Sequence, residues 1–222
     1  MTSAPAGTVY VVDDDPAIRE AIAVLARSVH LPAREFDSAL AFLEAYTPAG
    51  PACLVTDVCL PGMDGLELQQ ALAERDPGLP VIVVSGHGDI AMAVEMMRRG
   101  ALDFIEKPFR NHVLLARIRE ALERDAERWR RQRAEAGAAL RLARLTPRET
   151  EVAHHLARGE SNKQVARAFA LSPRTVEAHR ASILRKLEVR SVAGLATLLL
   201  AAGAGAAAAP APEPCSSTES PP

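Results

Sequence analysis

The stretch TVYVVDDDP, residues 8–16, joins an uninterrupted apolar run to three consecutive carboxylates and a proline. Two later runs have the same layout, since LVTD at residues 54–57 ends on an aspartate and VIVVS at residues 81–85 ends on a serine. Short runs that are apolar at nearly every position are typical of strands buried on both faces of a parallel sheet. Because the carboxyl ends of parallel strands share one edge, we expect the polar residues after these runs to meet there.

The remainder of the first 120 residues alternates short apolar runs with amphipathic stretches. Strands are predicted at residues 8–12, 33–36, 53–56, 81–85 and 102–105. Helices are predicted at residues 17–29, 38–46, 66–75, 90–99 and 113–123. This alternation predicts a flavodoxin-like, doubly wound α/β domain over residues 8–122, with strand order 2-1-3-4-5.

Residues 123–144 have a different composition, rich in Ala, Arg and Glu, which favours helix. We predict a charged helical linker that extends the preceding helix, with Gly137 as a candidate break. The arginines within residues 128–133 fit a solvated helix face.

Residues 145–202 contain four helix-start signals. Thr146-Pro147-Arg148-Glu149 and Ser161-Asn162-Lys163-Gln164 each form a capping box, Ser172-Pro173 starts a third helix, and Ser191 caps a fourth. Four short helices around a shared apolar core predict a small all-α domain. We expect the Ala-, Gly-, Pro- and Ser-rich residues 203–222 to be a disordered tail and residues 1–7 to be flexible.

The formal net charge of −2 conceals two modules of opposite sign. Residues 1–120 hold 10 Lys and Arg against 17 Asp and Glu, a net of −7. Residues 121–200 hold 16 against 9, a net of +7, and residues 201–222 have a net of −2. The basic module therefore has a polyanion as a candidate partner.

Cysteine content and hydropathy exclude several classes of protein. Cys53, Cys59 and Cys215 do not make a disulfide framework and fit a reducing cytosol. The first seven residues lack the layout of a signal peptide. Residues 191–212 carry no charge, but they are mostly Ala and Gly and their strongly apolar residues stop at Leu200, which argues against a membrane span. We therefore expect a cytoplasmic protein without membrane attachment.

The polar residues at the predicted carboxyl edge favour phosphoryl transfer. Asp13 and Asp14 follow the first strand, Asp57 ends the third, Ser85 ends the fourth and Lys107 follows the fifth. Converging carboxylates repel one another unless a cation lies among them, and an all-oxygen ligand set suggests Mg²⁺. A metal ion and a lysine that neutralise phosphoryl charge beside a carboxylate suit attack by that carboxylate on phosphorus. We assign Asp15, by contrast, to the start of a helix.

The segments VVDDDP, TDVCLPGMDG, VVSGHGD and DFIEKPF resemble, in order and spacing, the signature segments of response-regulator receiver domains. The resemblance implies that Asp57 accepts a phosphoryl group from a histidine kinase. It implies that Asp13, Asp14, Asp57 and the backbone carbonyl of Cys59 bind Mg²⁺. It further implies that Ser85 and Lys107 bind the phosphoryl group and that Phe104 is the aromatic switch residue.

Residues 145–202 resemble the LuxR-type helix-turn-helix of the NarL/FixJ family, and the segments that carry this resemblance are TPRE, SNKQVA, LSPRTVEAH and KL. Within that family, the segments SGHGD and DFIEKPF of the first module look most like the FixJ branch. The resemblance implies that the third helix enters the major groove of DNA. It gives Glu177, Ala178 and Ala181 as base-facing. Glu177 either accepts from cytosine N4 or complements the helix dipole. Phosphate contacts are assigned to Lys163, Arg174, Thr175, His179, Arg180 and Lys186.

Together these features predict a transcription regulator switched by phosphorylation of Asp57, and not an enzyme. The expected partners are a histidine kinase, promoter DNA and, after phosphorylation, a second copy of the chain, with RNA polymerase as a further candidate. Two alternatives stay open. One is an aspartyl-phosphate phosphatase, which needs an acid where Cys59 stands. The other is a regulator whose receiver dimerises without phosphorylation.

Overall fold

The computed structural model describes residues 7–86 and 90–206 and divides into two compact units, Met1–Arg130 and Arg131–Pro222. Most of the predicted flexible segment at residues 1–7 and of the predicted tail at residues 203–222, namely residues 1–6 and 207–222, lies outside the described residues.

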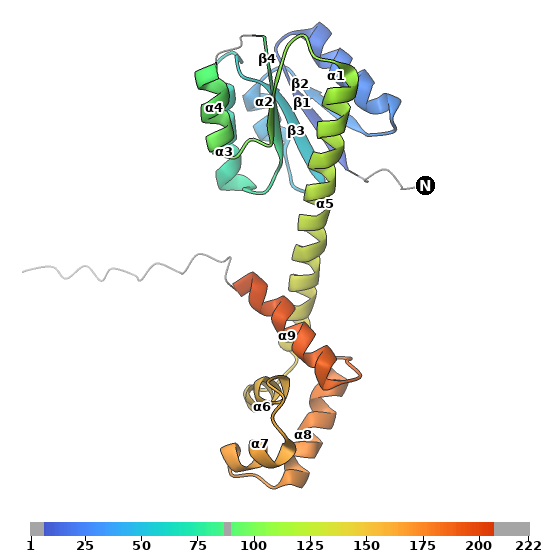
Figure 1. The fold of residues 1–222 in the computed structure, drawn as a ribbon, viewed down its shortest axis with the longest axis vertical. Helices are drawn as coiled ribbons and strands as arrows, with labels where there is room; N and C mark the ends of the chain where they lie inside the picture. The colour runs from blue at the N-terminus through green and yellow to red at the C-terminus, as the bar shows by residue number, and fades with distance from the viewer. Residues whose placement is uncertain (1–6, 87–89, 207–222) are drawn as a thin grey trace, which may run out of the picture. The chain divides into compact units, whose positions relative to one another are not determined.

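The first unit is built on a five-stranded parallel sheet (Figure 1). Its strands are β1 (Thr8–Val12), β2 (Ala33–Phe36), β3 (Ala52–Asp57), β4 (Val81–Ser85) and β5 (Asp103–Glu106). They are ordered β2-β1-β3-β4-β5, which confirms the doubly wound fold and the predicted strand order. Every residue of β3 and β4 is buried, as continuous apolar runs predict for central parallel strands.

Helices cover both faces of this sheet. Four of them are α1 (Pro16–Ser28), α2 (Ala39–Ala45), α3 (Gly65–Arg75) and α4 (Ile90–Arg98). Helices α2, α3 and α4 pack on one face around Phe42, Leu68 and Met96. On the other face, α1 and the fifth helix, α5 (Asn111–Leu142), pack around Ile22 and Ile118. The two layers fix the sheet between them, so the residues at its edges are held in place.

Helix α5 (Asn111–Leu142) is much longer than the predicted helix at residues 113–123, because it includes the predicted linker. It continues through Gly137 without a break. A glycine inside a helix costs only about 1 kcal/mol relative to alanine, and the alanines around it favour helix.

At the amino edge of the sheet, α5 is tied to the rest of the first unit by four polar side chains that we call the amino-edge network: Tyr46, Asp76, Asp125 and Arg128. Arg128 contacts the Asp76 carboxylate at 2.5 Å and the Asp125 carboxylate at 2.6 Å. Asp125 accepts from the backbone N–H of Ala52 at 2.7 Å, and the Tyr46 hydroxyl donates to Asp76 at 2.7 Å. The prediction that arginines in residues 128–133 form a solvated face is therefore wrong for Arg128, because it pairs with two buried aspartates, Asp125 on the same helix and Asp76 from a distant segment.

The second unit contains α6 (Pro147–Ala157), α7 (Asn162–Phe169), α8 (Pro173–Lys186) and α9 (Val192–Ala206). The capping boxes at Thr146 and Ser161 and the cap at Ser172 are confirmed. The helices share an apolar core that includes Val152, Val165 and Ile183. Helix α9 continues to Ala206, so the prediction that the disordered tail begins at residue 203 is wrong for residues 203–206; these residues are Ala and Gly, and alanine favours helix. Among the described helices, none combines the length and apolarity needed to cross a bilayer.

Candidate functional site

The carboxyl edge of the sheet gathers four charged side chains, which we call the carboxyl-edge cluster: Asp13, Asp14, Asp57 and Lys107. Asp13 and Asp14 directly follow β1, and Asp57 is the last residue of β3. Lys107 follows β5 and is joined to Pro108 by a cis peptide bond. These four residues come from the ends of three strands, so only the parallel pairing of the sheet brings them together.

Lys107 lies between two of the carboxylates. Its Nζ donates to Asp13 Oδ2 at 2.7 Å and to Asp57 Oδ2 at 2.6 Å. The other oxygen of Asp57 accepts from the backbone N–H of Cys59 at 3.2 Å, and Asp13 Oδ1 accepts from the N–H of Asp15 at 3.0 Å. The side chain of Asp57 retains 11% exposure, so a reactant can reach the carboxylate that the resemblance assigns as the phosphoryl acceptor.

Burial and charge shift the protonation equilibria of this cluster. Burial raises the pKa of Asp13, and the nearby ammonium of Lys107 offsets only part of that effect. Burial disfavours the charged form of Lys107, but hydrogen bonds to Asp13 and Asp57 outweigh it and raise the pKa of the lysine. One lysine therefore does not compensate the carboxylates around it.

The chemistry of the donors fits a hard divalent cation. Carboxylate oxygens of Asp13, Asp14 and Asp57 lie within 4.8 Å of one another. Asp14 is exposed and Asp13 is buried, so a bound ion would be held from inside while solvent water completed its coordination. Carboxylates together with water are the ligands that Mg²⁺ prefers, whereas thiolate and imidazole ligands would favour zinc.

The remaining residues that the sequence assigns to this edge have different environments. Ser85 is buried at the end of β4, and its carbonyl accepts from the backbone N–H of Lys107 at 2.8 Å. Phe104 is half-buried and packs against the core between the sheet and α2–α4. Cys59 is exposed. Asp15 caps α1 by accepting from the N–H of Ala17, which confirms its predicted structural role.

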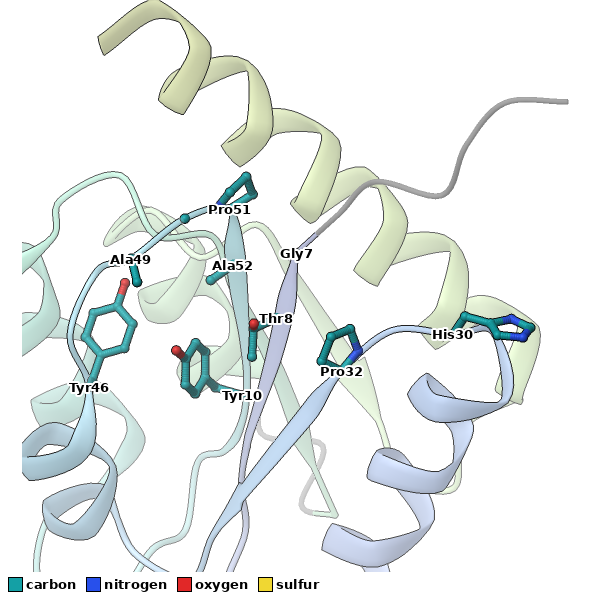
Figure 2. A pocket seen from close by; sticks show the side chains of 10 residues that line it. Gly7, Thr8, Tyr10, His30, Pro32, Tyr46, Ala49, Pro51 and Ala52 are labelled. Carbon is teal, nitrogen blue, oxygen red and sulfur yellow. The ribbon is translucent and has the colours of Figure 1, made fainter. Parts of the chain in front are cut away.

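A separate pocket of about 520 Å³ opens at the opposite, amino edge of the sheet (Figure 2). Tyr10, Tyr46, Pro32 and Pro51 line it together with small residues, and no carboxylate is among the lining residues. It therefore lacks the groups needed for metal binding or phosphoryl transfer.

In the second unit, the sides of α8 differ in exposure. Its predicted base-facing residues, Glu177, Ala178 and Ala181, are all exposed, whereas Val176 and Ile183 are in the core. Lys163 and Arg174 are exposed, and Thr175, His179 and Arg180 are half-buried. Among the residues that the structure describes, no acidic group pairs with Lys163, Arg174 or Arg180, so these cations are available to a polyanion.

Lys186 has a different environment from the other predicted phosphate contacts. Its Nζ lies 2.6 Å from the carboxylate of Glu149, which is buried at the start of α6. The sequence identifies Glu149 as part of a capping box but gives no sign that it pairs across to α8. The burial of Glu149 and its pairing with Lys186 can be recognised only from the packing of α6 against α8.

Comparison with known proteins finds two matched regions, one in each unit of the structure. Residues 9–119 match the family model of the response regulator receiver domain, and residues 143–199 match that of bacterial regulatory proteins of the luxR family. The transcriptional regulatory protein FixJ of Azorhizobium caulinodans is 43% identical, with 88% of this chain and 92% of the relative covered. FixJ of Bradyrhizobium diazoefficiens is 39% identical, with 89% and 96% covered. The structure of the response regulator StyR aligns with a TM-score of 0.80 at 39% identity, covering 88% of this chain and 98% of that one.

Proposed function

The chain belongs to the response regulators that join a receiver domain to a LuxR-type DNA-binding domain, and we propose that phosphorylation of Asp57 by a histidine kinase switches its binding to promoter DNA. The family is one of transcription regulators rather than of classical enzymes. The observation that carries the proposal is the position of the Asp57 carboxylate, which is reachable from solvent and held 2.6 Å from Lys107 beside Asp13 and Asp14.

The residues of the carboxyl-edge cluster have distinct roles in the proposed transfer. An oxygen of Asp57 attacks phosphorus, a P–O bond forms, and the P–N bond to the kinase histidine breaks with its electron pair leaving on nitrogen. Lys107 then pairs with a phosphoryl oxygen. Asp13, Asp14, Asp57 and the carbonyl of Cys59 would hold Mg²⁺, which when bound would offset the negative charge of the transferred group.

Switching requires that the phosphorylated receiver favours a second conformation. Ser85 hydrogen-bonds the new phosphoryl group, and Phe104 moves further into the core that it already contacts. These movements alter the surface of α4, β5 and α5. Val94, Met97 and Val113 are 38–44% exposed there, and this apolar surface supports pairing of two phosphorylated copies.

In the second unit, we assign base contacts to Glu177, Ala178 and Ala181 of α8. Phosphate contacts come from Lys163, Arg174, Thr175, His179 and Arg180. Dimerisation doubles these contacts, so DNA binding should be strongly dependent on salt. RNA polymerase is a further candidate partner. A cytoplasmic location agrees with the free thiols of Cys53 and Cys59.

The test is DNA selection from a random pool, followed by measurement of dimerisation and affinity with and without the phosphoryl mimic beryllium trifluoride. We expect tighter binding and dimerisation with the mimic, and loss of both responses in Asp57→Asn. Equal behaviour with and without the mimic would favour the regulator that needs no phosphorylation. Turnover of a small phosphate ester such as p-nitrophenyl phosphate would instead support the phosphatase alternative.

A further inference from the structure

Glu149 is the one charged residue that is buried in the described part of the second unit, with 5% exposure. Its carboxylate accepts three hydrogen bonds. The backbone N–H of Thr146 donates at 2.9 Å and closes the capping box of α6. The other two donors, Ser182 Oγ at 2.8 Å and Lys186 Nζ at 2.6 Å, both belong to α8.

Ser182 and Lys186 are four residues apart, so they occupy successive turns on one side of α8. The exposed Ala178 and Ala181 lie on the side that carries the proposed base contacts. Ser182 is also one turn from Ala178, so the carboxylate of Glu149 holds α8 along the flank of the surface that carries the proposed base contacts.

Apolar contacts alone leave a helix some freedom to roll or to slide along its axis, because dispersion and burial are not directional. Hydrogen bonds to a charged group have preferred distances and angles, and they are stronger than bonds between neutral groups. Hydrogen bonding by Lys186, Thr146 and Ser182 outweighs the effect of burial and lowers the pKa of Glu149 to about 2, so the carboxylate is charged at neutral pH.

We propose that Glu149 and Lys186 are positioning residues for DNA recognition, whose ion pair sets the roll and register of α8 against α6. Lys186 accordingly acts through α8 and not as a phosphate contact. The proposal rests on DNA binding by α8, as described under the proposed function. It separates Lys186 from Lys163, which is exposed and unpaired among the described acidic groups.

The experiment uses the full-length protein and two duplexes of equal length, the sequence enriched by wild-type protein and a scrambled version. Two quantities are measured for each variant: the ratio of the two affinities, and the slope of log Kobs against log salt concentration. The slope is expressed per bound copy of the chain. A residue that contacts phosphate changes this slope by about 0.9, whereas a residue that only orients α8 changes the ratio.

For Lys186→Met, we expect the affinity ratio to fall roughly tenfold, with no change in salt slope. Lys163→Met should instead reduce the slope by about 0.9 and leave the ratio unchanged. Lys186→Arg should restore the ratio, because arginine can still pair with Glu149. A slope reduced by about 0.9 in Lys186→Met, with an unchanged ratio, would overturn the proposal.

Lys186→Met leaves a buried carboxylate unpaired and can fail to fold, so the double variant Glu149→Gln, Lys186→Met is made as well. It has the net charge of the wild type, and glutamine still serves in a capping box. Circular dichroism verifies that it is folded at the assay temperature. We expect a reduced ratio at unchanged slope; a ratio equal to that of the wild type would refute the positioning role. Absence of DNA binding by the wild-type protein would instead count against the proposed function itself.

Discussion

Lys107 at the carboxyl edge of the receiver sheet and Arg128 at the amino edge each lie between two aspartates, yet only Arg128 satisfies the carboxylates around it. At the amino edge, hydrogen bonds from Arg128 and Tyr46 outweigh burial and lower the pKa of Asp76. At the carboxyl edge, burial prevails and raises the pKa of Asp13. Similar charges in the same domain are therefore balanced at one edge and unbalanced at the other.

The difference follows from the chemistry of the cations and from the number of acids. Arginine offers several donors in a fixed plane, and a tyrosine hydroxyl and a backbone N–H donate to the same two aspartates. Lysine is a point charge, and the exposed Asp14 adds a third carboxylate beside it. A surplus of carboxylates is suited to binding a metal ion and a phosphoryl group, whereas a satisfied set is suited to anchoring α5.

The largest expected effect is the loss of the anchor in Arg128→Met. This change leaves the buried Asp76 and Asp125 without their cation, and breaking a buried pair costs about 3–5 kcal/mol. Urea unfolding followed by the fluorescence of Trp129, the only tryptophan in the chain, measures the loss. The matched control is Arg130→Met, an exposed position on the same helix, where little change is expected. Equal stability of the two variants would show that the amino-edge network is not an anchor.

Acid should weaken the same network. Because the pKa of Asp76 is lowered on folding, its contribution to stability is present above its unfolded pKa of about 3.9 and is lost as the pH falls through the folded value. This group can contribute a slope of at most about 1.4 kcal/mol per pH unit in that range. Unfolding free energies measured from pH 5 downward should show a shallower slope in Arg128→Met than in the wild type. Identical slopes would contradict the assignment.

Magnesium should stabilise only the unbalanced edge. At ten times its dissociation constant, a ligand that binds the folded state alone adds about 1.4 kcal/mol to the free energy of unfolding. We expect this gain in the wild type and in Asp76→Asn, which leaves the carboxyl-edge cluster intact, but not in Asp57→Asn. Thermal unfolding in a magnesium titration measures it. A gain that persists in Asp57→Asn would place the metal elsewhere.

The smallest effect is a gain in stability for Asp13→Asn in the absence of magnesium. The pKa of Asp13 is raised on folding, mainly by burial, so the ionised carboxylate destabilises the folded protein at neutral pH. Its neutral replacement should stabilise the chain by about 1 kcal/mol, as is common when a binding residue is removed. Asp76→Asn should have the opposite sign in the same urea titration. Destabilisation by both substitutions would remove the proposed difference between the edges.

The carboxyl-edge cluster could be predicted from the sequence because each member directly follows a strand or ends one. Asp13, Asp57 and Lys107 needed only the rule that parallel strands end along a common edge. The helix caps at Thr146, Ser161 and Ser172 were predictable for a related reason, since a cap bonds to a backbone group three residues away.

The amino-edge network and the Glu149–Lys186 pair were not predictable in this way. Arg128 lies in a run of arginines and resembles its exposed neighbours until α5 is packed against Asp76, 52 residues earlier in the chain. Lys186 resembles a phosphate contact until α8 is packed against α6. In both pairs, the partner is fixed by which helix face becomes buried, and that depends on the whole core.

The alternation of elements, the helix starts and the residues at the end of each strand follow from the sequence alone, because these depend on local propensity and on a period of two or 3.6 residues. Which cation each buried carboxylate receives depends instead on tertiary packing. Lys107 and Asp13 are 94 residues apart in the chain, and Asp125 is 73 residues from Ala52, whose backbone N–H donates to it. Such pairs form only after the sheet and its helices have closed, because the cost of burying a charge is offset by a partner that packing brings into contact.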